Sequence, residues 1–292
     1  MTGLEILSMI SDISSVASGI VTIAGAVLSQ VTLNKKANKQ IMERIIQNDL
    51  NGLREDIISN EDISLRQKYM MYNFITIAEM ARLYDSEVCE DPQYDFEWFM
   101  RFYDASGGVG EEYLQSLWAK LLSEEVKMPS SYSLRTIETL RNISCQEARL
   151  FNRISPFFVC SENKNIFLPN YHDYLDHFDI DYSEIMDLSE VGLIYMEGDL
   201  TGQLQLDTNG KVFYVRKSSV ISICSIDESG KTIKIKQFPL TKVGREIYSL
   251  LDVDTSYEGF LLLCNEINKM DGVSARVSRS EKTANGYYKI TI

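Results

Sequence analysis

The sequence predicts a mainly α-helical protein with an α+β part at its C-terminal end. Apolar residues recur at helical spacing through most of the first 154 residues, and alternation typical of strands begins only beyond residue 155. With 292 residues, 45% of them apolar and 24% charged, the chain has the composition and length of about two globular domains. We expect a transmembrane-like helix that forms a membrane or pore segment over 1–34, a helical stalk over 35–60, a helical core domain over 61–154, and a winged-helix-like ligand-sensing domain over 155–292.

The first element is a run without charged residues from Ile13 to Asn34, which is 22 positions long. As a helix it would measure about 33 Å, close to the roughly 30 Å of a bilayer core. Only nine of these residues are Ile, Val or Leu, so one copy alone would insert marginally. Lys35 and Lys36 follow, and the positive-inside rule then predicts a single-pass protein with cytoplasmic C-terminal domains.

Small and hydroxyl residues form a stripe along this helix. They are spaced alternately three and four positions apart. The members of the stripe are Ser8, Ser11, Ser15, Ser18, Thr22, Gly25, Ser29 and Thr32. Such a heptad seam predicts a homo-oligomer, in which the seam packs helices closely in a membrane or lines a narrow pore. Two alternatives stay open. The helix could pack into the core of a soluble oligomer, or it could be a targeting peptide, although Glu5 and Asp12 disfavour the latter.

The remaining elements follow from periodicity and caps. We expect a helix over 35–58, then helices over 65–84, 95–103 and 111–125, and two short helices capped by Ser133 and Ser144. Beyond residue 155 we expect strands at 156–160, 165–168, 211–226, 231–238 and 286–292. Helices are expected over 182–191, 240–251 and 259–269, and Thr241 is expected to cap the second of them.

Cysteine and histidine usage gives no sign of a metal or a catalytic centre. The five cysteines form no Cys-x-x-Cys pair and their number is odd, which disfavours a zinc site or a disulfide framework. His172 and His177 are five residues apart and do not share a helical face. No phosphate loop, Gly-x-Ser-x-Gly or His-Glu-x-x-His motif is present. We therefore predict no metal, no cofactor and no enzymatic activity.

Four motifs in the central part resemble a known family. They read Asp95-Phe-Glu-Trp-Phe99, Gln115-Ser-Leu-Trp-Ala-Lys-Leu-Leu-Ser-Glu124, Pro129-Ser-Ser-Tyr-Ser-Leu-Arg-Thr136 and Ser144-Cys-Gln-Glu-Ala-Arg-Leu-Phe151. The pattern is similar to a bacterial domain family of unknown function found in uncharacterised and antiphage-defence proteins. The later Gly192-Leu-Ile194 and Leu240-Thr-Lys-Val-Gly244 are similar to that family too.

With the N-terminal helix, this resemblance implies a membrane effector of a defence operon, such as the effectors of the Hailong antiphage system. In that system a nucleotidyltransferase partner supplies an oligonucleotide that controls a channel-forming effector. The candidate site residues within the motifs are Gln115, Trp118, Glu124, Ser133 and Arg135. Trp118 reads as a core residue. The polar members read either as caps and a buried ion pair, or as contacts to a ligand or another subunit.

A basic cluster lies near the C-terminal end of the chain. Between residues 205 and 250, eight basic residues stand against four acidic ones, a local charge of +4 in a chain of −13. The basic residues are Lys211, Arg216, Lys217, Lys231, Lys234, Lys236, Lys242 and Arg245. The overall acidity argues against broad nucleic-acid binding. The cluster reads either as a solvated strand face or as a site for a nucleotide or short DNA, with Tyr214 or Phe238 able to stack on a base.

These observations favour an oligomeric effector of the bacterial inner membrane that acts in antiphage defence by abortive infection. It would form an ion-conducting or membrane-depolarising pore gated by an oligonucleotide. The alternative is a soluble, self-associating winged-helix protein that binds DNA or a partner protein. A winged-helix pattern by itself decides little between these functions.

Overall fold

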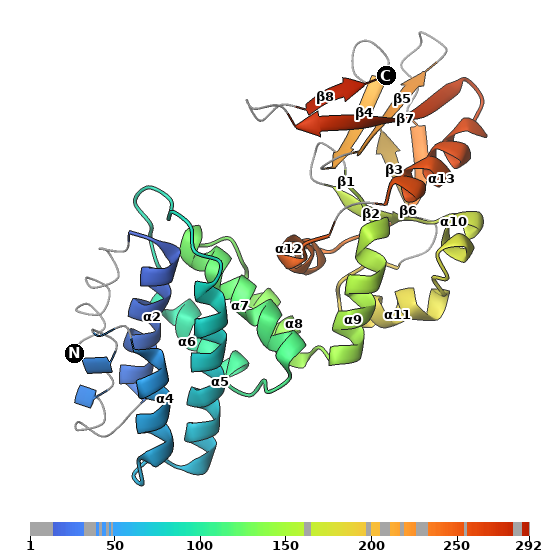
Figure 1. The fold of residues 1–292 in the computed structure, drawn as a ribbon. Helices are drawn as coiled ribbons and strands as arrows, with labels where there is room; N and C mark the ends of the chain where they lie inside the picture. Colours follow the sequence, from blue (N-terminus) through green and yellow to red (C-terminus); the bar gives the residue numbers. More distant parts are fainter. Residues whose placement is uncertain are drawn as a thin grey trace. The chain divides into compact units, whose positions relative to one another are not determined.

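The computed structural model describes residues 14–31, 39–40, 43–44, 47, 49–160, 165–196, 200–204, 211–216, 219–225, 233–253, 256–282 and 288–291. The protein is mainly helical, with antiparallel sheets in its C-terminal half, which confirms the predicted fold class at that level (Figure 1). The chain divides into two compact units, Met1–Cys145 and Gln146–Ile292. The predicted boundary after residue 154 coincides instead with the end of a helix of the second unit.

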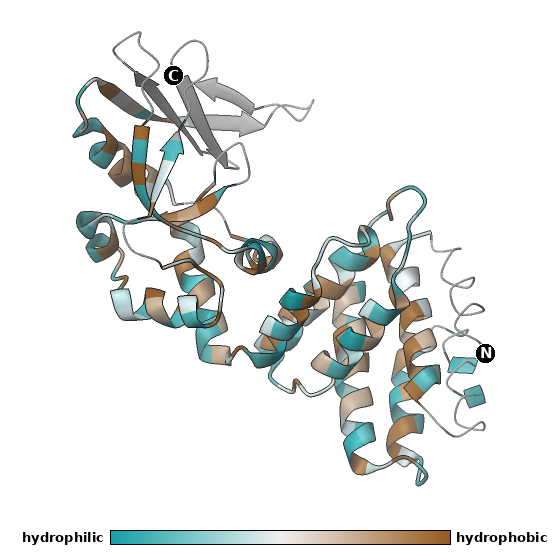
Figure 2. Cartoon of the chain, turned by 180° about the vertical axis from the view of Figure 1, so that it is seen from behind, coloured by the Kyte–Doolittle hydropathy of each residue, from teal (hydrophilic) through white to brown (hydrophobic). Residues whose placement is uncertain are grey.

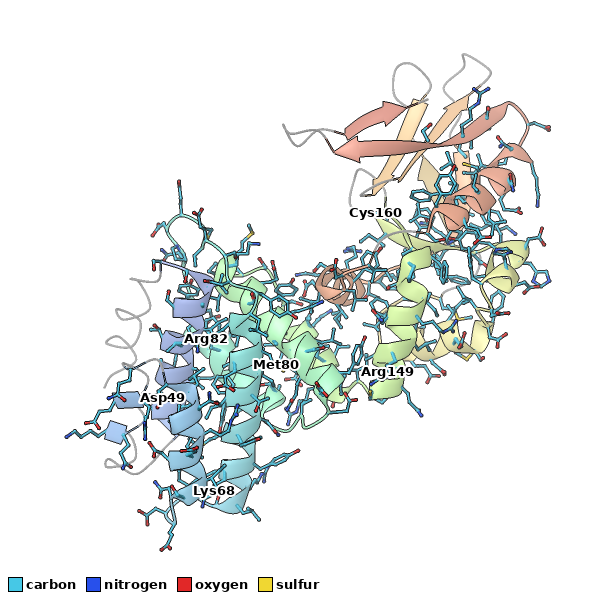
Figure 3. All side chains as sticks on the ribbon, in the orientation of Figure 1. Asp49, Lys68, Met80, Arg82, Arg149 and Cys160 are labelled. Carbon is cyan, nitrogen blue, oxygen red and sulfur yellow. The ribbon has the colours of Figure 1, made fainter. Side chains whose placement is uncertain are left out.

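The first unit is a helical bundle. Its helices are α2 (Val16–Val31), α4 (Leu50–Ser59), α5 (Leu65–Arg82), α6 (Phe96–Ser106), α7 (Glu112–Lys127) and α8 (Leu134–Asn142). Helix α2 packs against α5, α6 and α7, while α4 packs on α5 and α8 packs on α6 (Figure 1). The helix predicted over 35–58 is interrupted, because Asp49 has non-helical dihedral angles and caps α4 through Gly52 N (Figure 3).

Aromatic rings join α5, α6 and α7 in the core of this unit. Phe102 of α6 lies at the centre, with its ring centroid 5.1 Å from Trp118 and 6.3 Å from Phe74. Trp98 stacks on Phe102 at 5.5 Å and donates its indole N–H to Tyr132 O. The predicted core role of Trp118 agrees with its complete burial. Edge-to-face pairs of this kind stabilise a core beyond their buried area, by about 1 kcal/mol each.

Helix α2 is the apolar helix of this bundle (Figure 2). Ten of its 16 residues are buried, and no residue from Ser14 to Val31 is charged. The buried residues form the aliphatic side of the helix, which is the apolar stripe that a helix of a globular protein turns toward the core. Within the part of the chain that the structure describes, no helix combines the length and the apolarity that crossing a membrane requires. The expectation of a transmembrane helix over 1–34 is therefore not supported by this fold.

The second unit mixes helices with two antiparallel sheets. Its helices are α9 (Cys145–Ile154), η1 (Ser155–Phe157), α10 (His172–His177), α11 (Tyr182–Glu190), α12 (Lys242–Leu250) and α13 (Tyr257–Asn268). Its strands are β1 (Val159–Cys160), β2 (Ile166–Pro169), β3 (Thr201–Leu204), β4 (Lys211–Arg216), β5 (Ser219–Ser225), β6 (Ile233–Pro239), β7 (Val273–Lys282) and β8 (Tyr288–Thr291).

The sheets have the orders β1-β2-β6-β3 and β4-β5-β7-β8, and every pairing is antiparallel. The strands predicted within 211–226 and 231–238 are confirmed. The winged-helix expectation is not supported, because the described strands build two four-stranded sheets rather than one small sheet with a wing.

Candidate functional site

The described members of the predicted seam lie on α2 or at its start, on the less buried side of the helix. Ser18 is exposed, Ser15, Thr22 and Ser29 are half-buried, and Gly25 is buried. Ser8, Ser11 and Thr32 lie outside the described residues. The exposed side of α2 thus carries the hydroxyl groups, whereas its aliphatic side packs into the bundle.

The seam hydroxyl groups bond to their own helix. Ser18 Oγ donates to Ser15 O at 2.9 Å, Thr22 Oγ1 to Ser18 O at 3.0 Å, and Ser29 Oγ to Ala26 O at 2.8 Å. Such back-bonding satisfies a hydroxyl without any outside partner. This side of α2 can therefore face an apolar environment without leaving the three hydroxyl donors unpaired.

The N-terminal end of α2 contacts the segment that follows α5. Val16 N donates to Ser86 O at 3.0 Å, and Ala17 N donates to the Asp85 carboxylate at 2.8 Å. Ser15 and Glu87 form an isolated antiparallel bridge. Since the first amides of a helix have no partner within it, this segment caps α2 from a distant part of the sequence.

The basic cluster does not form one surface in the described residues. Lys234 and Lys236 are exposed and alternate with buried Ile233 and Ile235 on β6. On α12, Lys242 pairs with Glu246 at 3.6 Å, and Arg245 donates to Leu240 O at 2.9 Å. Lys211 and Arg216 belong to β4, in the other sheet, and Lys217 and Lys231 lie outside the described residues. Among the basic side chains whose exposure the structure describes, the β6 pair is therefore the one that is exposed and lies on a single strand.

The predicted stacking role of Phe238 is wrong, because this residue is only 2% exposed and lies under Tyr182. Tyr182, which the sequence analysis missed, is 50% exposed. Its hydroxyl donates to Asn170 Oδ1 at 2.8 Å, and Asn170 N donates to Lys236 O at 3.0 Å. The exposed ring is therefore connected through Asn170 to the backbone of Lys236. An exposed ring together with lysines is a combination suited to an anionic ligand with an aromatic base. The side chain of Tyr214 is not described.

The candidate residues of the central motifs separate into structural and surface roles. Gln115 is 7% exposed, and its amide donates to Val109 O at 2.8 Å. Buried Asn73 donates to Gly107 O at 2.9 Å, so these two amides hold the turn between α6 and α7. Arg135 is exposed on α8. Glu124 pairs at the surface with Lys127, 4.0 Å away. The motif residues Glu124 and Arg135 therefore do not form a buried ion pair.

Ser133 is the N-cap residue of α8, but its side chain makes no capping hydrogen bond. The Ser133 hydroxyl lies 3.4 Å from the Thr136 hydroxyl instead. The histidines pair with carboxylates of their own unit, His172 with Asp176 at 3.3 Å and His177 with Glu258 at 2.9 Å. No group of three metal-ligating side chains occurs among the residues that the structure describes.

The buried carboxylate of this region is Glu125, the neighbour of the motif residue Glu124. Glu125 is 3% exposed and accepts hydrogen bonds from Ser130 N at 2.7 Å and Tyr132 N at 3.0 Å. It therefore fixes the turn after α7, where Ser130 has a positive φ of 67°. A helical phase that places Trp118, Leu121 and Leu122 inside also places Glu125 inside, because 118, 122 and 125 share a face.

Burial raises the pKa of Glu125 above 4.5, against the lowering effect of the backbone N–H groups that it accepts. A raised pKa in the folded state means that the folded protein binds more protons between the unfolded and folded pKa values. We expect stability from this group to be present below the unfolded pKa and to fall as the pH rises through the folded pKa. Glu125→Gln removes this contribution, so the difference in the free energy of unfolding between the wild type and the variant should fall as the pH rises, measured by urea titration from pH 4 upward. A difference that does not vary with pH would contradict this assignment.

Two motifs of the second unit meet at one junction. Thr241 N donates to Leu193 O at 3.0 Å, and Thr241 Oγ1 donates to Gly192 O at 2.6 Å. Thr241 Oγ1 also accepts from Gly244 N at 2.9 Å, which confirms its predicted role as the cap of α12. Gly192 has a φ of +83°, a conformation that favours glycine. The Gly-Leu-Ile and Leu-Thr-x-x-Gly motifs are therefore halves of one packing element, and their role is structural.

Comparison with known proteins adds one finding. A family model of proteins of unknown function matches residues 60–263, which is more than half of the chain. The matched range contains the aromatic core of the first unit and the junction of the two glycine motifs, but α2 lies outside it. No curated protein and no solved structure matches the chain.

Proposed function

The chain belongs to the DUF2806 family, and we propose that it is a self-associating effector of antiphage defence that depolarises the bacterial inner membrane. In this proposal, α2 is stored in the helical bundle at rest and enters the membrane together with α2 of other copies. The second unit controls this step by binding an anionic ligand, a nucleotide or short DNA that a nearby nucleotidyltransferase could supply. The two units would keep their places on the cytoplasmic side.

The observation that supports the proposal most directly is the chemistry of α2. The helix has no charged side chain, and its exposed hydroxyl groups are satisfied by its own carbonyl groups. The uncharged run extends from Ile13 to Asn34, beyond both ends of the helix described here. A helix of this kind needs no charged contact with the bundle and can exchange a protein core for a bilayer at a small polar penalty.

The second unit supports the ligand part of the proposal. Lys234 and Lys236 are exposed on β6, and their register partners on β3 are the exposed Gln203 and Thr201. Tyr182 adds an exposed ring on the neighbouring α11. Charges of one sign, hydrogen-bonding side chains and a stacking surface are the groups that recognise a single-stranded or mononucleotide ligand.

The burial of α2 favours a second candidate function. As a core helix, α2 would have no membrane step, and the chain would be a self-associating protein that binds DNA or a partner protein through its second unit. Both candidates share the ligand surface and differ in whether α2 ever leaves the bundle. The decisive experiment must therefore change α2 without unfolding the unit.

The test is a lysine placed at the middle of the uncharged run. Thr22 is half-buried at that depth, while exposed Gln30 is four residues from the end of the run, so Gln30→Lys is the matched control. A lysine at the centre of a membrane helix costs about 3 kcal/mol, whereas one near the end extends its charge to the interface. We expect Thr22→Lys to abolish depolarisation, read with a voltage-sensitive dye, and Gln30→Lys to preserve it.

Thermal melting of both variants must first show folded protein. The assay is run with and without the neighbouring operon genes, because the ligand could hold the effector inactive. Full depolarisation by Thr22→Lys would rule out membrane entry of α2. The second candidate would be favoured if the wild-type chain depolarised the membrane neither with nor without the operon genes and stayed in solution without detergent.

A further inference from the structure

A four-residue segment between α5 and α6 holds the N-terminal end of α2, and we infer that this segment, Tyr84–Glu87, is a latch. This inference rests on the proposed function and states how release of α2 is controlled. The segment supplies Asp85, Ser86 and Glu87 to the first turn of α2, through the two hydrogen bonds and the bridge described above. Its partners on α2 are 68 or more residues away in sequence, so these contacts exist only while α2 is docked.

The latch is itself anchored to the bundle. Tyr84 N donates to Ala81 O at 3.1 Å, which ties the segment to the end of α5. Tyr84 O accepts a hydrogen bond from buried Ser123 of α7 at 3.5 Å. After the latch, Cys89 N donates to Lys127 O at the end of α7, 3.0 Å away. Movement of α7 or α5 at this end would therefore be transmitted to the groups that cap α2.

Helix α2 also carries a cap of its own. Ser18 N donates to Ser15 Oγ at 3.3 Å, and Ser15 N donates to Ser18 Oγ at 3.1 Å, which is the reciprocal arrangement of a capping box. This local cap moves with the helix. The start of α2 can therefore stay helical without Asp85, and the Asp85 contact contributes to docking rather than to helix formation.

The charge of Asp85 strengthens the docked state. A carboxylate at a helix N-terminus is favoured by the helix dipole and by the unpaired amide groups there. Asp85 lies in an exposed position, so its replacement disturbs no core packing. A substitution at this residue is therefore expected to change the docking equilibrium and little else.

The first test measures docking directly by hydrogen exchange of peptides that cover residues 14–31. Loss of a capping side chain increases local opening by about five-fold. We expect Asp85→Ala to raise exchange of these peptides by that factor, with the peptides of α7 unchanged. Asp104→Ala, which removes an exposed carboxylate from α6, is the matched control and should leave the α2 peptides unchanged. If hydrogen exchange of the α2 peptides were unchanged in Asp85→Ala, the latch would be overturned. This outcome does not depend on whether the protein depolarises membranes.

The second test locks the latch. Residues opposed in an antiparallel bridge have Cα atoms about 4.5–5.5 Å apart, within the range of a disulfide. Ser15→Cys and Glu87→Cys, combined with Cys89→Ser to avoid mispairing, should give a protein that releases no dye from anionic lipid vesicles until it is reduced. Dye release that already occurs before reduction and is not increased by it would overturn the latch as a gate. Faster exchange in Asp85→Ala, with no dye release by any variant, would support the latch and overturn the proposed function.

Discussion

Gly244→Ala is expected to destabilise the second unit by about 3 kcal/mol, although the change lies in a helix. A Cβ atom at Gly244 would lie 2.0 Å from Leu193 O and 2.9 Å from Leu193 C. These are backbone atoms, and Leu193 O already accepts a hydrogen bond from Thr241 N at 3.0 Å. Neither side of the contact can rotate away, so α12 must shift from the Gly-Leu-Ile turn.

Helix propensity alone predicts the opposite sign. Gly244 is in the first turn of α12, and alanine is favoured over glycine in a helix by about 1 kcal/mol. The steric term outweighs this gain, because relief of the clash would break the Thr241 and Gly192 contacts that join the two motifs. We therefore expect the steric cost of the added Cβ atom to exceed the gain in helix propensity, so that the variant is less stable than the wild type.

Urea unfolding of the full chain measures the effect, with Gly108→Ala as the control. A Cβ at Gly108 would meet no atom within 4 Å, so that variant should unfold at the wild-type midpoint. A Gly244→Ala protein as stable as the wild type would show that the close approach to Leu193 is not a feature of the folded protein.

Patterns that depend on local sequence were predictable, and the partner of each apolar surface was not. Helical spacing located α5, α6 and α7, and the threonine before α12 identified its cap. The uncharged run was correctly assigned to a helix, but membranes and protein cores both exclude charge, so composition alone cannot separate them. Only the packing against α5, α6 and α7 shows where α2 lies in this structure.

The errors at single residues have the same origin. Glu124 belongs to the matching motif, but the phase of α7 turns Glu125 inward. Phe238 follows the alternation of β6, yet Tyr182 of α11 covers it, a tertiary contact that no local pattern encodes. The six basic residues of this cluster that the structure describes belong to two sheets and a helix, because strand order rather than sequence distance decides which of them meet.

Deletion of residues 1–34 is expected to unfold the first unit and to spare the second. The deletion removes α2, whose Ile20, Ile23, Val27 and Leu28 are at most 1% exposed. Each buried side chain of this size stabilises the fold by about 2 kcal/mol, and their sum approaches the whole stability of a typical domain, about 5–15 kcal/mol. Calorimetry should show the transition of the first unit lost and that of the second unit, Gln146–Ile292, retained.

Deletion of residues 1–13 is the control, since it keeps every described contact of α2 with α5, α6 and α7 and should preserve both transitions. Two transitions in the chain that lacks 1–34 would show that the bundle does not depend on α2.

The expected loss of the folded first unit also decides how membrane assays must be designed. A truncated chain that fails to depolarise would be inactive for lack of a folded unit as well as for lack of a membrane helix. Thr22→Lys separates the two causes once thermal melting has shown that its bundle is folded, because the substitution then changes only whether α2 can enter a membrane.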